Sequence, residues 1–132
     1  AMARVAAASE TGDARDRAMH RLTRAMAAHP DLVAGEGRSC TELMRAMEGR
    51  VAIKTGAEGV FVAIIPERKM GLALKIADGA TRGSEAAVTA LLVRLGVLDP
   101  GHPAALRRLG GVQRNWRGLA AAEVHAAPGF PA

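Results

Sequence analysis

The chain has few of the residues on which several classes of site depend. Its 132 residues include one cysteine (Cys40), no tyrosine, two phenylalanines and one tryptophan. Because a single cysteine cannot form an internal disulfide bond, a cytoplasmic protein is the simplest expectation. No apolar run approaches the roughly 18–20 residues that a membrane-spanning helix needs, and no signal-peptide pattern follows the start of the chain. We therefore expect no membrane partner.

The net charge is positive, at +5. Such a balance raises the hypothesis of nucleic-acid binding. However, the arginines are scattered along the chain rather than gathered on one predicted face, and few aromatic side chains could stack on bases. We expect no nucleic-acid partner. We interpret the basic residues as a solvated surface, which is also compatible with small anionic or zwitterionic substrates.

The composition predicts one folded domain with ragged ends. Apolar residues make up 49% of the chain, which is enough for one domain with a core. We expect a single α+β domain over residues 10–125. An alanine precedes Met2, so we interpret residues 1–9 as the remnant of a cloning tag and a flexible start. Residues 126–132 contain two prolines and a glycine and are expected to be a flexible tail.

Helices are predicted where apolar residues recur with helical spacing. Residues 11–28 should form one, capped by Thr11, with four inward-facing residues at every fourth position: Ala14, Ala18, Leu22 and Met26. Residues 39–47 should form a short helix that begins with a capping box between Ser39 and Glu42. Further helices are expected over residues 80–95 and 103–109.

Between these helices the pattern changes to that of strands. Residues 51–54, 60–65 and 71–76 are β-branched and apolar, and the short bends between them make neighbouring strands antiparallel. Pro66 should lie in the second bend, because it cannot donate to a strand ladder. Residues 119–125 could add a C-terminal strand, and Trp116 is expected to anchor packing. These elements predict an antiparallel sheet packed by helices.

The end of the first predicted strand carries the most informative motif. Lys54, Thr55 and Gly56 form the Lys-Thr-Gly element of serine acyl-transfer enzymes with the penicillin-recognising fold. There the lysine brings charge and protons to the edge of the active site. Thr55 would bind a substrate carboxylate or satisfy the bend. Gly56 would permit close approach of substrate or serve only the turn.

The chemical partner of this motif is missing from the chain. It should be Ser-x-x-Lys, in which the lysine one helical turn after the serine acts as its base. The residues three positions after Ser9, Ser39 and Ser84 are glycine, glutamate and alanine. Two interpretations follow: Lys-Thr-Gly is a coincidence, or the chain is a portion of a larger enzyme.

A longer pattern surrounds the motif. It consists of residues 39–46 (SCTELMRA), 54–60 (KTGAEGV), 71–76 (GLALKI), 78–82 (DGATR) and 115–118 (NWRG). This pattern resembles the C-terminal part of the Rhizobium-type, thermolabile L-asparaginase II family, over roughly residues 10–125. Those proteins are bacterial amidohydrolases whose fold is similar to that of serine β-lactamases.

The resemblance implies an activity and a site. The activity is hydrolysis of L-asparagine to aspartate and ammonia by an activated serine, with Lys54 as the second catalytic lysine. Thr55, Gly56 and Cys40 are implied to lie at the substrate pocket. The family's Ser-x-x-Lys and its zinc-binding cysteines would lie in an N-terminal segment that this chain lacks. We therefore expect no cofactor and no metal site in this chain, and no activity without that segment.

The missing nucleophile leaves a second hypothesis open. The chain could be a non-catalytic binding or interaction module on a related scaffold. In either case three short strands leave two unpaired sheet edges, and a partial enzyme would expose apolar surface. We therefore expect the chain to form a homo-oligomer.

Overall fold

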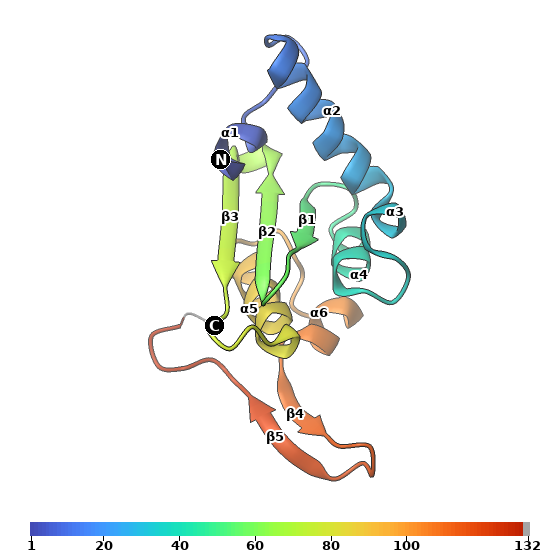
Figure 1. Cartoon of the computed structure of the whole chain (residues 1–132), viewed down its shortest axis with the longest axis vertical. Coiled ribbons are helices and arrows are strands. Elements are labelled where there is room, and N and C mark those ends of the chain that lie inside the picture. The colour runs from blue at the N-terminus through green and yellow to red at the C-terminus, as the bar shows by residue number, and fades with distance from the viewer. Residues whose placement is uncertain (131–132) are drawn as a thin grey trace.

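The computed structural model describes residues 1–130. A three-stranded antiparallel sheet in the order β1-β2-β3 lies at the centre, and a separate two-stranded hairpin follows it (Figure 1). The strands are β1 (Ala52–Thr55), β2 (Val60–Ile65), β3 (Met70–Lys75), β4 (Gly111–Arg114) and β5 (Ala120–Val124). The predicted α+β class is confirmed.

Helices cover both faces of the central sheet. They are α1 (Met2–Ala6), α2 (Ala14–Ala28), α3 (Pro30–Ala34), α4 (Ser39–Ala46), α5 (Thr81–Arg94) and α6 (Pro103–Arg108). Helix α1 contacts β2 and β3 on one face, and α5 contacts the same two strands on the other (Figure 1). No helix among residues 1–130 is long and apolar enough to cross a membrane.

The central sheet is the predicted meander. Lys54 on β1 pairs with Val62 on β2, and Val62 pairs with Ala73 on β3. Pro66 opens the 3-10 turn η1 (Pro66–Arg68) at the second bend, as expected. Each strand begins and ends within one residue of the prediction, because alternation and turn residues are strong local signals.

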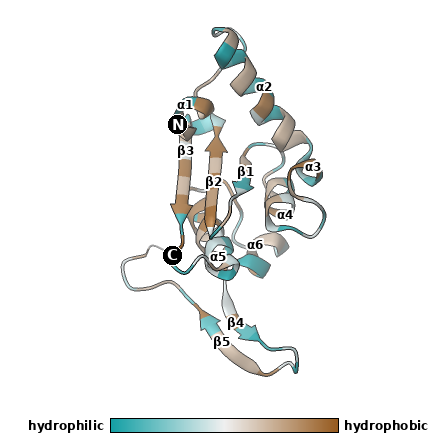
Figure 2. Cartoon of the chain, in the orientation of Figure 1, coloured by the Kyte–Doolittle hydropathy of each residue, from teal (hydrophilic) through white to brown (hydrophobic). Residues whose placement is uncertain are grey.

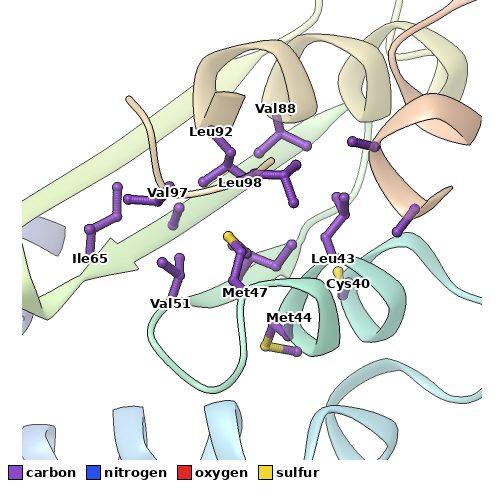
Figure 3. Close-up of a cluster of buried hydrophobic side chains, with 14 of the residues drawn as sticks. Cys40, Leu43, Met44, Met47, Val51, Ile65, Val88, Leu92, Val97 and Leu98 are labelled. Carbon is purple, nitrogen blue, oxygen red and sulfur yellow. The ribbon is translucent and has the colours of Figure 1, made fainter. Parts of the chain in front are cut away.

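The main core lies between the sheet and helices α4 and α5 (Figure 3). Alternate residues of a strand point to the same face, and the inward residues of β1 and β2 are Ile53, Phe61, Ala63 and Ile65. They pack against fully buried side chains of the helix segments: Leu43, Met44, Met47, Val88 and Leu92. Burying each of the larger side chains stabilises the fold by about 1.5–3 kcal/mol.

Helix α1 was not expected from the sequence. Residues 1–9 were predicted to be a flexible start, whereas Met2–Ala6 form a helix whose residue Ala6 is buried against Ala52 and Ile64. A Cβ atom on Gly71 would come within 2.3 Å of the Met2 backbone. Glycine at this one position of β3 is therefore what allows α1 to lie on the sheet.

The predicted orientation of α2 is wrong. Leu22 is 66% exposed, and the residues buried on this helix are Thr23 and Ala27. Alanines supply little apolar area, so a stripe in which two of the four residues are alanine does not decide which side of a helix faces inward. The N-cap is Asp13 instead of Thr11, because its side chain accepts a 2.8 Å hydrogen bond from Asp16 N.

The expected capping box at the start of α4 does not form. Arg38 is the N-cap residue and makes no side-chain cap bond. The carboxylate of Glu42 is instead engaged by Arg108, at 2.8 Å from Nη2 to Oε2. A guanidinium in a half-buried position attracts a carboxylate more strongly than the exposed backbone amide at a helix start does.

Arg108 joins three helices through charged hydrogen bonds. Its Nη1 donates to Glu85 on α5 at 2.8 Å, while Nη2 donates to Glu42 on α4 and to the carbonyl of Gly37. Burial disfavours the guanidinium charge, but the bonds to both carboxylates outweigh this effect and raise the pKa of Arg108. The three side chains therefore lock α4, α5 and α6 together.

The C-terminal hairpin stands apart from the central sheet. The strand expected over residues 119–125 exists, but it pairs with β4 and does not extend the meander. Asn115 Oδ1 accepts hydrogen bonds from Arg117 N and Leu119 N and so shapes the turn. Trp116 at this turn is 93% exposed, so its predicted role as a packing anchor is wrong.

Candidate active site

Lys54 lies at the exposed end of the edge strand β1. Its neighbour Ile53 points into the core, so Lys54 points to the opposite face of the sheet. The ammonium donates a 2.7 Å hydrogen bond to the carbonyl of Thr55. That bond bends the side chain back toward the Thr55–Gly56 turn and leaves two ammonium protons for other partners.

Thr55 and Gly56 form the bend that follows Lys54. The Thr55 hydroxyl lies 3.3 Å from the Gly56 carbonyl and 3.4 Å from the Val60 carbonyl, and it can donate to either of them. Its lone pairs stay available as acceptors. Gly56 is placed by packing: a Cβ there would lie 3.1 Å from Val60 Cβ. The Thr55 hydroxyl is thus satisfied by carbonyls of the bend itself, and the outer side of the bend faces solvent.

Cys40 lies directly behind this bend. It is 1% exposed, in the first turn of α4, and its sulfur accepts a 3.3 Å hydrogen bond from Thr55 N. Burial raises the pKa of the Cys40 thiol, although the Thr55 amide and the positive charge of Lys54 partly offset that effect. The thiol therefore stays protonated at neutral pH and is a poor nucleophile. The structure thus places Cys40 beside the Lys-Thr-Gly bend. That these residues line a substrate pocket stays a prediction.

A partly apolar floor lies beside Lys54 on the same face of the sheet. Val62 and Ala73 occupy the same cross-strand row, and Val60 and Lys75 occupy the next. Val60 and Val62 are only half-buried, and Ala73 is exposed. Helix α1 covers only the other end of this face, around Gly71. This floor could not be predicted from the sequence, because it depends on the register between strands.

A second ammonium lies at the same end of the face. Lys75 Nζ donates to the carbonyls of Glu58 and Ile76. The exposed half-face therefore carries a small apolar surface with a lysine on either side. Such a surface suits an anionic or zwitterionic group, since both of its charged side chains are cationic.

Three cavities elsewhere in the molecule do not include the motif. One of about 360 Å³ lies between α1, α2 and β1, and one of about 320 Å³ lies between α5 and the C-terminal segment. Neither these nor a third hollow beside α3 and α4 is lined by Lys54, Thr55 or Gly56. In the part of the chain that the structure describes, the Lys-Thr-Gly residues lie at the solvent-facing end of β1, outside these three cavities. We call these residues the Lys-Thr-Gly wall.

The serines of the chain form no hydrogen bond with Lys54 within residues 1–130. Ser39 and Ser84 are buried, and the Ser84 hydroxyl donates to the carbonyl of Thr81. The Ser9 hydroxyl lies 3.4 Å from that of Thr11, near the start of the chain.

The zinc that the resemblance implies finds no suitable ligands here. Among the described residues, no three His, Cys, Asp or Glu side chains gather closely enough to hold a metal ion. A tetrahedral zinc site needs three or four such side chains. We therefore derive no chemical step through a metal.

Comparison with known proteins identifies a family. The model of the family described as L-asparaginase II matches residues 1–126. A search of curated proteins finds no match to the chain. The family match covers the Lys-Thr-Gly wall, the whole central sheet and the C-terminal hairpin, and it confirms the resemblance drawn from the motifs.

Proposed function

Because the chain belongs to the L-asparaginase II family, we propose that it supplies the Lys-Thr-Gly wall of an amidohydrolase that releases ammonia from L-asparagine. The observation that carries this proposal is the position of Lys54. Its ammonium lies at a strand end beside a bend with an open outer side and an exposed, partly apolar floor. The proposal includes the serine β-lactamase-like fold and a bacterial cytoplasmic setting, which suits a chain with one buried thiol.

The proposed reaction requires a serine other than the three serines of this chain. In the proposed reaction that serine's oxygen attacks the side-chain amide carbon of asparagine, and its proton passes to a base. The C–N bond then breaks, and the nitrogen takes up a proton and leaves as ammonia. Water hydrolyses the acyl-serine ester, which releases aspartate and restores the hydroxyl. Lys54 holds positive charge beside the oxygen that becomes negative and relays a proton.

The other motif residues position the substrate. The Thr55 hydroxyl retains acceptor capacity toward the substrate ammonium, and it can rotate to donate to the α-carboxylate. Gly56 has no side chain, so substrate can approach the backbone at this position. Cys40 supports the wall from behind through the Thr55 amide, and its protonated state keeps it out of the covalent chemistry.

The experiment measures ammonia release from L-asparagine by two proteins. One is this chain alone, and the other is the chain joined to the polypeptide encoded directly upstream, if that segment carries Ser-x-x-Lys. We expect activity only in the joined protein. In the joined protein, Lys54→Ala should lower kcat/KM by at least about a hundredfold. The folded structure of the joined protein should stay unchanged.

The matched control is Lys69→Asn, at the far bend of the same sheet. Lys69 has a positive φ of 49°, which asparagine tolerates, and its ammonium is remote from the wall. This variant should keep the parent activity within about twofold, because exposed substitutions away from a site have small effects. A joined protein that is inactive on asparagine, or one that is indifferent to Lys54→Ala, would disprove the proposal.

The second candidate is a non-catalytic binding module. It is favoured by one observation: within the described residues, Lys54 faces an open surface and not an enclosed cavity. Calorimetry separates the two candidates. A binding module would bind asparagine without releasing ammonia even in the joined protein, and Lys54→Ala would weaken that binding.

A further inference from the structure

The bend that follows Lys-Thr-Gly contains a residue with a strained backbone. Glu58, two positions after Gly56, has a φ of 54°. This is the left-handed region, which a residue with a Cβ atom adopts only at a cost in free energy. Such a conformation persists where surrounding groups hold it in place, and strain of this kind gathers at functional sites. The contacts that hold Glu58 therefore bear on the geometry of the Lys-Thr-Gly wall.

The holding contacts come from the segment that follows β3. Lys75 Nζ donates to the carbonyl of Glu58, and Ile76 N donates to the carbonyl of Gly59 at 3.1 Å. The two segments also touch: a Cβ atom on Gly59 would lie 3.1 Å from the carbonyl carbon of Gly79. The bend is therefore held from the side of β3, although it joins β1 to β2.

The segment behind these contacts is itself fixed to α5. Asp78 Oδ1 accepts a 2.8 Å hydrogen bond from Ala80 N, and Asp78 Oδ2 lies 3.1 Å from Arg82 Nη2. The Ile76 carbonyl accepts a 3.1 Å hydrogen bond from Gly79 N. Since α5 packs into the main core, this segment offers the bend a firm support.

The Lys75 ammonium is engaged by the backbone on two sides. It donates to the carbonyl of Glu58 and, at 3.0 Å, to that of Ile76, so two of its three protons are used. The bend in turn sets the position of Lys54, whose ammonium is bonded to the Thr55 carbonyl. A displaced bend therefore displaces this carbonyl and the Lys54 ammonium. An error of about 1 Å in the position of a reacting group can cost roughly a hundredfold in rate.

We infer that Lys75 is a positioning residue for the Lys-Thr-Gly wall: its bond to the Glu58 carbonyl keeps the bend in the strained form that places Lys54 and Thr55. The catalytic consequence of this inference rests on the proposed function, whereas its effect on the bend does not. In this role Lys75 acts through the backbone and not by contact with the substrate. Two measurements, one on this chain and one on the joined protein, therefore test the inference separately.

Amide hydrogen exchange measures the bend in this chain alone, with nuclear magnetic resonance following each amide. Lys75→Met keeps the aliphatic stem and removes the donor. The amides of Gly56, Val60 and Ile76, which donate within the bend or onto it, should then exchange at least about tenfold faster, while Leu92 in the core keeps its rate. Lys75→Arg retains donors for the same carbonyl, so its rates should stay within about threefold of the parent.

Kinetics of the joined protein measure the consequence for the reaction. Lys75→Met should lower kcat for L-asparagine at least about tenfold and change KM by less than about threefold, because a displaced Lys54 affects the transition state more than substrate binding. Lys75→Arg should recover most of the lost kcat. The matched control is Lys69→Asn, which removes an ammonium directly before the other end of β3. This control should behave like the parent in both measurements.

Variants of Glu58 separate the effect of strain from that of charge. In the Lys75→Met background, Glu58→Gly allows a positive φ without steric cost, so the bend no longer needs to be held. This double variant should regain at least about threefold of the lost kcat and slow the exchange of the Gly56 amide. Glu58→Gln removes the same carboxylate but keeps the Cβ atom, so it should regain neither.

Each outcome supports or overturns the inference. Unchanged exchange at Gly56 and Ile76 in Lys75→Met overturns it, and so does a parent-like kcat of that variant in an active joined protein. A rescue by Glu58→Gln equal to that by Glu58→Gly also overturns it, because Lys75 would then act through its charge. A joined protein that is inactive before any substitution counts against the proposed function alone, and the exchange rates then decide whether Lys75 holds the bend.

Discussion

The main core and the hairpin arm (β4, β5 and the turn between them) use similar residues in opposite ways. In the core, Leu43, Phe61 and Leu92 are fully buried between sheet and helices, whereas on the arm Val112 and Trp116 face solvent. Figure 2 shows the same contrast, with mostly hydrophobic colour on β2 and β3 and a mixed pattern on β4 and β5. Apolar side chains are buried only where three or more elements converge, and two strands alone provide no such place.

The contrast has a consequence for function. The Lys-Thr-Gly wall belongs to the well-packed region, because Cys40 and the core side of β1 support it from behind. A catalytic group has to be held rigidly, so this is the region suited to chemistry. The arm has the opposite character, because its apolar side chains face solvent. Each of the following predictions tests that difference.

The largest expected difference is in thiol accessibility. In the parent chain Cys40 should react with iodoacetamide at least about a thousandfold more slowly than a cysteine introduced by Trp116→Cys in a Cys40→Ala background, because Cys40 is exposed to reagent only when the core opens. Mass spectrometry of the labelled chains measures both rates. Similar rates at the two positions would show that the core is no better ordered than the arm.

The same thiol predicts a dependence of stability on pH. The folded pKa of Cys40 is raised, so its contribution is complete below the ordinary thiol pKa of about 8.5 and is lost as pH rises toward the folded value. The free energy of unfolding should therefore fall above that pH more steeply in the parent than in Cys40→Ala. Urea titrations at several pH values measure this difference.

Truncating the core should be costly. Phe61→Ala removes a fully buried ring from the centre of the sheet, and such substitutions lower the free energy of unfolding by about 3–5 kcal/mol. Denaturant unfolding followed by circular dichroism measures the loss. A change below about 1 kcal/mol would mean that the sheet and helices are loosely packed.

Breaking the charged junction of the three helices should cost less. Arg108→Ala leaves Glu42 and Glu85 without their shared partner, and both side chains are about four-fifths buried in the parent. We expect a loss of about 2–3 kcal/mol, below the value for a fully buried pair because water reaches the site and Arg107 still lies 3.4 Å from Glu42. The triple variant with Glu42→Gln and Glu85→Gln should recover part of the loss, since it removes both half-buried carboxylate charges.

Crowding the contact between α1 and β3 should have a local effect. Gly71→Ala places a methyl group against the Met2 backbone, so α1 has to move, at an expected cost of about 1–3 kcal/mol. Hydrogen exchange should show faster exchange in residues 2–6 and little change in β2. Unchanged protection of α1 would contradict the observed close approach.

The smallest effect is expected on the arm itself. Trp116→Ala should change the free energy of unfolding by less than about 0.5 kcal/mol, as for most exposed positions. The measurement is the same urea titration used for Phe61→Ala. A loss comparable to that of Phe61→Ala would place Trp116 inside the folded core and erase the contrast between the two regions.

Local signals account for what could be predicted from the sequence. The meander, the helix over residues 81–94 and the position of Pro66 follow from alternation, helical spacing and turn residues, each of which acts within a few positions. The Lys-Thr-Gly motif was placed correctly at the end of a strand for the same reason. Its catalytic role remains a prediction, because the described residues hold neither a serine bonded to Lys54 nor an enclosed pocket around it.

The amino-acid sequence by itself determined the three strands of the meander and the helices α2, α4, α5 and α6, and it put Lys54 where a strand ends, whereas α1, α3 and β4 became visible only in the structure. Only the tertiary structure decided that α2 buries Thr23 rather than Leu22, that Glu42 pairs with Arg108, and that Trp116 faces water. The physical reason is the distance along the chain over which each effect acts. Backbone preference is settled among neighbours in the chain, whereas burial and charge pairing depend on which distant elements meet, and that depends on the packing of the whole molecule.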